Sequence, residues 1–215
     1  RNMVFSIINI LRITGKPFKK TSVPPSLQIE PTNYCNVKCI SCPNMRMERK
    51  KGYMNFGLFK KIINDAKKIG VKRIQLYLHG EPLLHPDIAG MISFIKQNGL
   101  GLSMATNGML LDRQMADQVL STGLNSGDYI TFSVLGNTKE THERIMKNIN
   151  HDMVVSNILN FLDKRKEMKK NGPIVESIIY VMEENRDEIK GFKEKWTGVV
   201  DHVHPIVSIS ESFRS

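Results

Sequence analysis

Residues 27–42, LQIEPTNYCNVKCISC, join a short apolar stretch to all three cysteines of this 215-residue chain. Cys35, Cys39 and Cys42 have the spacing C-x3-C-x2-C. Three thiolates on so short a loop can hold three irons of a cubane [4Fe-4S] cluster and leave the fourth iron without a protein ligand. An iron with an open position can bind and activate a small molecule. The spacing therefore predicts an iron–sulfur site directly after a first strand.

The composition is ordinary for a globular protein, with 40% apolar and 24% charged residues. The length suits one domain better than two. The longest apolar run, near residues 4–11, is shorter than the ~20 residues needed to cross a bilayer, and it lacks the small-residue cleavage site of a secretory signal. Clustered cysteines do not indicate a disulfide framework. These features predict a reducing, cytoplasmic location.

The formal charge of +10 is compatible with an anionic substrate, a nucleic acid or an anionic membrane surface. Many lysines fall in stretches with helical character, such as residues 60–68 and 164–170. We therefore interpret the charge mainly as a solvated exterior. Because no basic strand motif with interleaved aromatic residues is present, we do not expect nucleic acid as a partner.

Residues 1–25 form a basic lead segment in which Phe5, Ile8 and Leu11 can share one helical face. We expect this face to pack against the core; the alternative is contact of residues 1–20 with a membrane surface. Pro24 and Pro25 end the segment. The main domain is predicted over residues 26–207, followed by a tail at 208–215.

A regular alternation of strands and helices fills the main domain. Strands are predicted at residues 27–30, 73–78, 100–105, 129–134, 174–182 and 199–207. Helices are predicted at residues 55–70, 86–98, 112–123, 138–170 (with a break near Asn150) and 186–196. Such alternation is typical of a parallel sheet in an α/β fold. Right-handed crossovers would curl six strands into a partial (βα)6 TIM-like barrel with the helices outside.

The first of these helices illustrates the local signals. Asn55 is the expected cap, Gly70 the expected stop, and one apolar face is predicted. The predicted face consists of Leu58, Ile62, Ala66 and Ile69.

In barrels of this type the active site lies at the C-terminal ends of the strands. The cysteine loop, residues 79–82, residues 106–108 and Ser133 all fall at those ends. We therefore expect them to form one site. Gln28 and Glu30 are predicted to face the barrel lumen, because alternate residues of a strand point inward.

The C-x3-C-x2-C motif after a first strand resembles that of the radical S-adenosylmethionine (SAM) enzymes. His79-Gly80-Glu81-Pro82 is similar to the family's GGEP motif, which receives the SAM amino group. The resemblance implies that Gly80, Glu81 and Pro82 bind SAM. In this role Gly80 would permit close backbone approach, and Glu81 would place a negative charge near the ammonium.

The resemblance continues through the rest of the chain, over roughly residues 26–207. Thr106-Asn107-Gly108 resembles the third-strand TNG element, and Ser133 stands where a polar fourth-strand residue often contacts SAM; the resemblance thus adds Asn107 and Ser133 to the SAM-binding residues. Residues 184–203, ENRDEIKGFKEKWTGVVDHV, resemble the fifth helix and sixth strand of the subgroup that carries a SPASM or twitch extension.

Three features depart from the family pattern. Ser41 precedes the third cysteine, where an aromatic residue near the adenine is usual. Ser133 is followed by Val134, so the fourth-strand aspartate is missing. Since no cysteine is left for auxiliary clusters, we expect a core whose C-terminal extension is absent.

The resemblance implies an enzyme. Its [4Fe-4S] cluster would reductively cleave SAM to a 5′-deoxyadenosyl radical, which abstracts hydrogen from an organic substrate. The implied class is an oxidoreductase or modifying enzyme that acts on a sugar or cyclitol alcohol or on a peptide. A reductant such as flavodoxin or ferredoxin is the implied partner.

The sequence leaves two alternatives to this interpretation open. One is a Cys3His zinc site with His79 or His85 as the fourth ligand. The other is a non-catalytic iron–sulfur protein that carries electrons or acts as a scaffold. The second alternative requires a fourth cluster ligand and excludes SAM binding.

Overall fold

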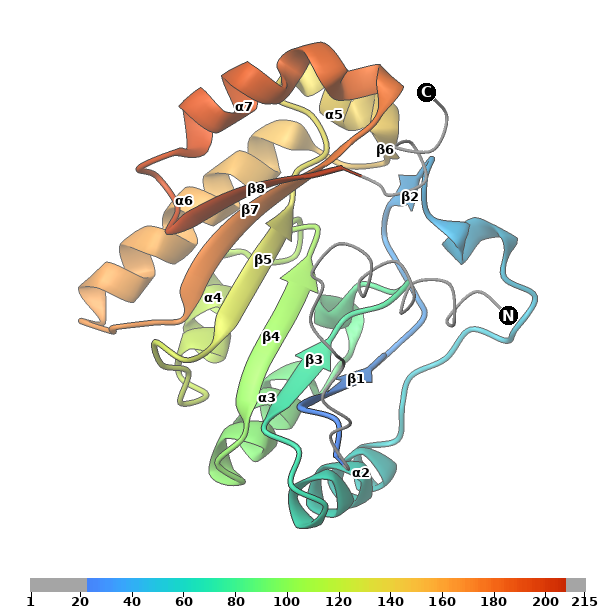
Figure 1. The fold of residues 1–215 in the computed structure, drawn as a ribbon, viewed down its shortest axis with the longest axis vertical. Helices are drawn as coiled ribbons and strands as arrows, with labels where there is room; N and C mark the ends of the chain where they lie inside the picture. Colours follow the sequence, from blue (N-terminus) through green and yellow to red (C-terminus); the bar gives the residue numbers. More distant parts are fainter. Residues whose placement is uncertain (1–22, 208–215) are drawn as a thin grey trace, which may run out of the picture.

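The computed structural model describes residues 23–207, which form a curved six-stranded parallel sheet with helices along its outer side (Figure 1). The strand order is β1-β3-β4-β5-β7-β8, with each strand parallel to its neighbours. The predicted α/β partial barrel is therefore confirmed. The predictions for residues 1–22 and for the tail at 208–215 lie outside the described residues.

The strands of the sheet are β1 (Ser26–Ile29), β3 (Arg73–Leu76), β4 (Gly101–Thr106), β5 (Tyr129–Ser133), β7 (Ile174–Val181) and β8 (His202–Val207). The helices are α2 (Phe56–Lys68), α3 (Ile88–Gln97), α4 (Arg113–Leu120), α5 (Lys139–Ile145), α6 (His151–Glu167) and α7 (Ile189–Trp196). Three short 3-10 helices are η1 (Pro43–Arg46), η2 (Pro82–Leu84) and η3 (Glu183–Glu188). A separate two-stranded ladder joins β2 (Lys38–Cys39) to β6 (Met146–Lys147).

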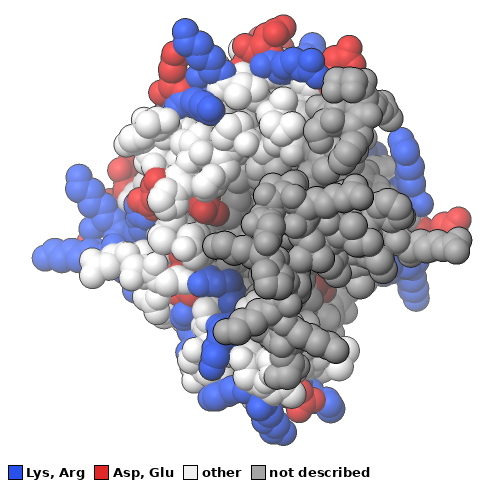
Figure 2. All heavy atoms as spheres, viewed as in Figure 1, with Lys and Arg blue, Asp and Glu red and all other residues white. Residues whose placement is uncertain are grey.

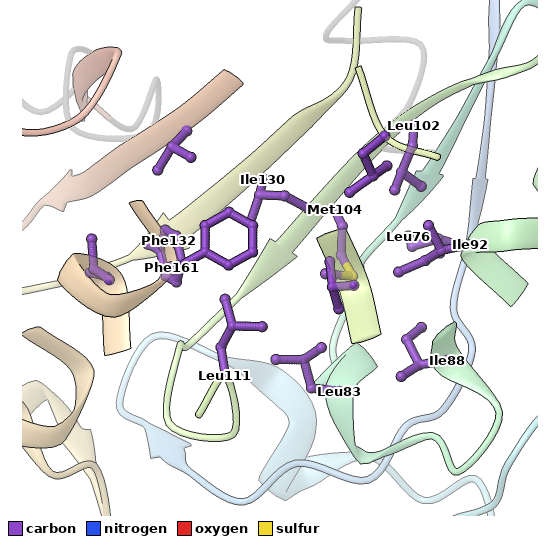
Figure 3. Close-up of a cluster of buried hydrophobic side chains, with 14 of the residues drawn as sticks. Leu76, Leu83, Ile88, Ile92, Leu102, Met104, Leu111, Ile130, Phe132 and Phe161 are labelled. Atoms are coloured by element: carbon purple, nitrogen blue, oxygen red, sulfur yellow. The ribbon is translucent and has the colours of Figure 1, made fainter. Parts of the chain in front are cut away.

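The core lies between the outer face of the sheet and the helices, as Figure 3 shows. Leu102 and Met104 of β4 and Ile130 and Phe132 of β5 are fully buried there. These residues alternate with Ser103, Thr131 and other polar side chains that face the opposite side. Successive strand residues point to opposite faces, so one strand supplies both the core and the inner surface.

Two helix caps occur as predicted. The Asn55 side chain accepts a hydrogen bond from the Leu58 amide, and the Asp112 side chain accepts one from the Met115 amide. The buried face predicted for α2 was right for Ala66 and for the partly buried Ile62, but wrong for Leu58 and Ile69. The helix buries Phe59, Ile63 and Ala66, whereas Leu58 is 51% exposed and Ile69 57% exposed. Both sets have helical spacing, and the one that includes the large Phe59 ring packs against the core.

The remaining differences concern element ends. The predicted break near Asn150 is the β6 strand, which pairs antiparallel with the cysteine loop. The last helix begins at Ile189, because residues 183–188 form η3. Strand β8 begins at His202 because Gly198, with φ +82°, makes a turn before it. The sequence periodicity carries no signal for a two-residue strand.

Basic side chains lie around the rim of the visible face in several places, with acidic ones among them (Figure 2). The picture agrees with a solvated basic exterior rather than one large patch on this face. None of the helices within residues 23–207 is long and apolar enough to span a bilayer.

Candidate active site

A cavity at the C-terminal ends of the strands brings the predicted site residues together. It is lined by the three cysteines, by His79, Gly80 and Glu81 after β3, by Asn107 after β4, and by Ser133 at the end of β5. Figure 1 shows the arrowheads of β4 and β5 pointing toward the side where β2 and β6 lie. Parallel strands place their carboxyl ends at one edge, and this shared edge explains why segments far apart in sequence meet here.

The cysteine loop is held by pairing with β6 and by a turn of its own. Cys39 lies in β2 opposite Met146 of β6, and the Ile40 amide donates to the Ile145 carbonyl over 3.0 Å. The Cys42 amide donates to the Cys39 carbonyl over 3.1 Å, which closes a turn between the last two cysteines. All three thiols are free and half-buried. This loop is therefore an ordered thiol site that opens into the cavity.

The thiols of Cys35 and Cys39 are neutral unless a metal binds them. Burial raises the pKa of the Cys35 thiol, and burial together with the neighbouring Cys35 and Cys42 raises the pKa of Cys39 to about 12. Without a cation these thiols stay protonated, whereas iron binds the thiolate and displaces the proton. Three unpaired thiols on one wall of a cavity fit a [4Fe-4S] cluster with an open iron.

Gly80 allows the turn after β3 to pack against the chain that leads into the cysteine loop. A Cβ atom at this position would lie 1.9 Å from the Thr32 carbonyl oxygen and 2.9 Å from the Asn33 Cα. The next amide, of Glu81, donates to the Tyr34 carbonyl over 2.8 Å. The protein's own packing therefore requires glycine at this position, which itself lines the cavity next to Glu81.

Glu81 is buried and connects two of the loops. One carboxylate oxygen accepts from the Thr106 hydroxyl over 2.7 Å and from the Leu83 amide over 3.1 Å, and the other accepts from the Asn107 amide over 2.8 Å. Burial raises the pKa of this carboxyl, and the three hydrogen bonds oppose the rise. Glu81 thus fixes the position of residues 106–107, a role that the motif alone does not predict. Direct contact with an ammonium group stays a prediction.

Of the other residues expected to bind SAM, two line the cavity, Asn107 and Ser133, and one does not, Pro82. Asn107 donates to the Asn36 side chain over 2.8 Å and accepts from the Met109 amide, so it connects the TNG turn to the cysteine loop. No hydrogen bond within residues 23–207 engages the Ser133 hydroxyl, which lies on the cavity wall. Pro82 is buried, starts η2 and does not line the cavity. The expected contact of Pro82 with SAM has no support from this position.

Gln28 lies on the inner face of the sheet, as predicted, because it alternates with the buried Ile29 and its register partner Gln75 lines a cavity on that face. Gln28 donates to the Tyr77 carbonyl over 2.9 Å. Glu30 accepts from the His79 amide over 3.1 Å and pairs with Arg49 at 2.6 Å. Neither side chain lines the cavity that holds the cysteines, so the prediction for Glu30 has no support from this position.

The geometry disfavours the zinc alternative. His85 is buried; its Nε2 lies 2.9 Å from the Met54 carbonyl, and its Nδ1 accepts from the Asp87 amide over 3.0 Å. Both ring nitrogens are thus engaged, and the structural interpretation of His85 is supported. Within the part of the chain that the structure describes, no three Cys, His, Asp or Glu side chains converge on a single metal ion.

Comparison with known proteins identifies the family. The model of the radical SAM superfamily matches residues 29–195. The chain belongs to the radical SAM superfamily. The recognition made from the cysteine and HGEP motifs is therefore confirmed. Members of this superfamily use a [4Fe-4S] cluster and SAM, and the donor set described above fits both.

Individual relatives cover parts of the chain. The tungsten-containing aldehyde ferredoxin oxidoreductase cofactor-modifying protein of Pyrococcus furiosus is 35% identical over 109 residues, which are 50% of this chain and 30% of that protein. PqqA peptide cyclase of Gluconobacter oxydans is 30% identical over 125 residues, 58% of this chain and 34% of the cyclase. The chain thus spans about a third of the length of these curated relatives.

A solved structure supports the fold. Streptococcus suis SuiB bound to its precursor peptide SuiA superposes with a TM-score of 0.72 at 16% identity, over 94% of this chain and 43% of SuiB. At this identity the likeness concerns the architecture alone.

Motif reasoning missed two tyrosines of the site, Tyr77 and Tyr180, which line the cavity beside the cysteines. It included Thr106 but not its hydrogen bond to the Glu81 carboxylate. Tyr77 lies two residues after Gln75, and Tyr180 lies near the end of β7. The two-residue period along their own strands is the signal that could have found the tyrosines, because Gln75 and Ile178, two residues earlier, also face the inner side.

Proposed function

We propose that this chain is a radical SAM enzyme in which Cys35, Cys39 and Cys42 hold a [4Fe-4S] cluster. When bound, the cluster and SAM would supply a 5′-deoxyadenosyl radical that abstracts hydrogen from an organic substrate. The observation that carries the proposal is that three free thiols and the residues of both SAM motifs line one cavity.

The protein's own residues would position SAM and keep water out. Ser133 offers a free hydroxyl, and Gly80 and Asn107 lie on the same wall. Val37 and Leu135 are buried apolar residues beside the cysteines, which limits solvent access to the loop. The Glu81 carboxylate would hold the Asn107 backbone in place during binding. Pro82 would act only through the turn that it starts.

For the substrate we favour a peptide over a sugar or cyclitol alcohol. PqqA peptide cyclase is named for a peptide substrate and is 30% identical over 58% of this chain. Oxidoreductase activity, the flavodoxin or ferredoxin reductant and the cytoplasmic location stay predictions. The alternative of a non-catalytic carrier requires a fourth cysteine or another cluster ligand, and the sequence has three cysteines in all.

The test is anaerobic turnover of SAM. The reconstituted protein is reduced with dithionite and incubated with SAM, and 5′-deoxyadenosine and methionine are separated by chromatography. We expect both products from the wild type and neither from Cys39→Ser. If the wild type forms no 5′-deoxyadenosine although it carries the cluster, the proposal is wrong for this chain.

A further inference from the structure

A second cavity adjoins the one lined by the cysteines. It lies on the inner side of the sheet and takes its lining from β3, β4, β5, β7 and β8. Tyr77 and Ala105 line both cavities, so a molecule held in the second lies next to the cluster site. Its volume of about 360 Å³ is within the range of small-molecule sites.

Glu176 is the one acidic side chain on the wall of this cavity. Its carboxylate accepts from the Thr131 hydroxyl over 2.8 Å and lies 3.3 Å from His204 Nε2. Thr131 is the direct register partner of Glu176 on β5, so adjacent strands hold the carboxylate in place. The side chain is only 18% exposed.

No permanent cation balances this carboxylate within residues 23–207. Its one ion-pair partner there is His204, whose half-exposed ring is a cation only when protonated. A partly buried carboxylate is costly unless it is paired or well hydrogen-bonded. Its two oxygens together offer about four acceptor positions, and the contacts above use two of them. A ligand cation that carries N–H groups could therefore pair with the negative charge of Glu176 and donate hydrogen bonds to its unused acceptor positions.

We propose that Glu176 binds an ammonium group of the substrate in this cavity. The inference rests on the proposed function, because it places the substrate beside the SAM site. The side-chain amide of Gln75 and the hydroxyl of Tyr129 also line the cavity, and no hydrogen bond within the described residues engages either. They can accept or donate to the atoms next to the ammonium. The chemical class is a primary amine, such as a lysine side chain or the amino end of a peptide.

The test compares two probes that differ in one group: N-acetyl-lysine methylamide and its 6-hydroxynorleucine counterpart. Binding to the reconstituted, oxidised protein with SAM present is followed by the methyl NMR signals of Ala105 and Ile178, which line the cavity. Ile92 and Ile158 are buried in the core and serve as reference signals. We expect the lysine probe to shift the cavity methyls alone.

Glu176→Gln keeps the shape of the side chain and removes its charge. We expect it to weaken binding of the lysine probe by about tenfold to a hundredfold and to leave the hydroxyl probe unchanged. Equal affinity of the lysine probe for both proteins, equal affinity of the two probes for the wild type, or no binding of either probe would overturn the inference. If Glu176→Gln does not fold, Glu176→Asp keeps the charge and should still prefer the lysine probe.

The outcome is separable from that of the proposed function. Glu176→Gln should keep the response of the cluster to SAM, since Glu176 lines only the second cavity. A wild type that binds the lysine probe but does not cleave SAM would contradict the proposed function and leave the ammonium site standing. A wild type that cleaves SAM but binds the lysine and hydroxyl probes with equal affinity would contradict the ammonium site alone.

Discussion

The two faces of the central strands differ sharply in what they carry. On the outer face, Leu102, Met104, Ile130 and Phe132 are completely buried under helices. On the inner face, Ala105, Thr131 and Ser133 line the two cavities. The faces alternate residue by residue, so neighbours in sequence belong to different environments. Stability and chemistry can therefore be changed independently on the same strand.

The largest expected effect is loss of the cluster without loss of the fold. Cys39→Ser should lower the iron content from about four atoms per chain to nearly none, because the third thiolate is lost. The melting temperature of the protein without cluster should change little, since the side chain is only half-buried. Iron analysis and circular dichroism measure the two quantities. Ser41→Ala, at an exposed position two residues away, is the matched control and should keep the iron.

A retained cluster in Cys39→Ser would show that another residue supplies the third ligand. Loss of the fold in this variant would show that the two faces are not independent.

The next effect concerns the outer face. Phe132→Ala should lower the free energy of unfolding by about 3–5 kcal/mol, because it leaves a cavity against Phe161 and the helices. The next residue, Ser133, points to the other face. Ser133→Ala should therefore change the free energy of unfolding by less than about 0.5 kcal/mol. Denaturant unfolding of the protein without cluster measures both. Similar losses for the two variants would contradict the separation of the faces.

The third effect tests the backbone contact beneath the site. Gly80→Ala should destabilise the fold by about 1–3 kcal/mol and weaken cluster retention, since the new Cβ meets the Thr32 carbonyl oxygen. Gly52→Ala is the control, because no atom lies within 4 Å of a Cβ built there. Denaturant unfolding and iron content report the two consequences. A Gly80→Ala protein as stable as the control would mean that this turn is free to move.

The smallest effect concerns a pair of histidines between α5 and α6. His142 Nδ1 lies 3.0 Å from His151 Nδ1, and burial, with the charge of His151 and Lys195, lowers the pKa of His142 to about 3. The unfolded chain binds a proton as the pH falls through about 6.5, whereas the folded chain does not. Stability is therefore complete above that value and is lost as the pH falls from it toward about 3.

We expect His142 to account for a loss of about 1 kcal/mol in unfolding free energy between about pH 7 and about pH 5.5. Denaturant unfolding at several pH values measures it. In His142→Gln the slope over this range should become shallower. An unchanged slope in that variant would assign the pH dependence to other groups.

The sequence was informative where a signal is local or periodic. The alternation of strands and helices predicted the parallel sheet, and Asn55 and Asp112 marked two helix starts. It also placed Cys39 and Ser133 at the same edge, because parallel strands share their carboxyl ends. These features depend on residues close together in the chain.

What could not be predicted depends on contacts between distant segments. The bonds from Glu81 to Thr106 and Asn107 span 25 and 26 residues, and no short motif specifies them. The pairing of Thr131 with Glu176 depends on strand register across 45 residues. The partly wrong face predicted for α2 has a different cause: two apolar sets have helical spacing, and only packing selects between them.

Binding of SAM to an open iron of the cluster is tested by an electron paramagnetic resonance spectrum of the anaerobically reconstituted, dithionite-reduced protein, recorded with and without SAM. A cluster held by Cys35, Cys39 and Cys42 has an open iron that SAM can bind. We therefore expect a cubane-type signal that changes when SAM is added. A cluster signal that SAM leaves unchanged would contradict this expectation.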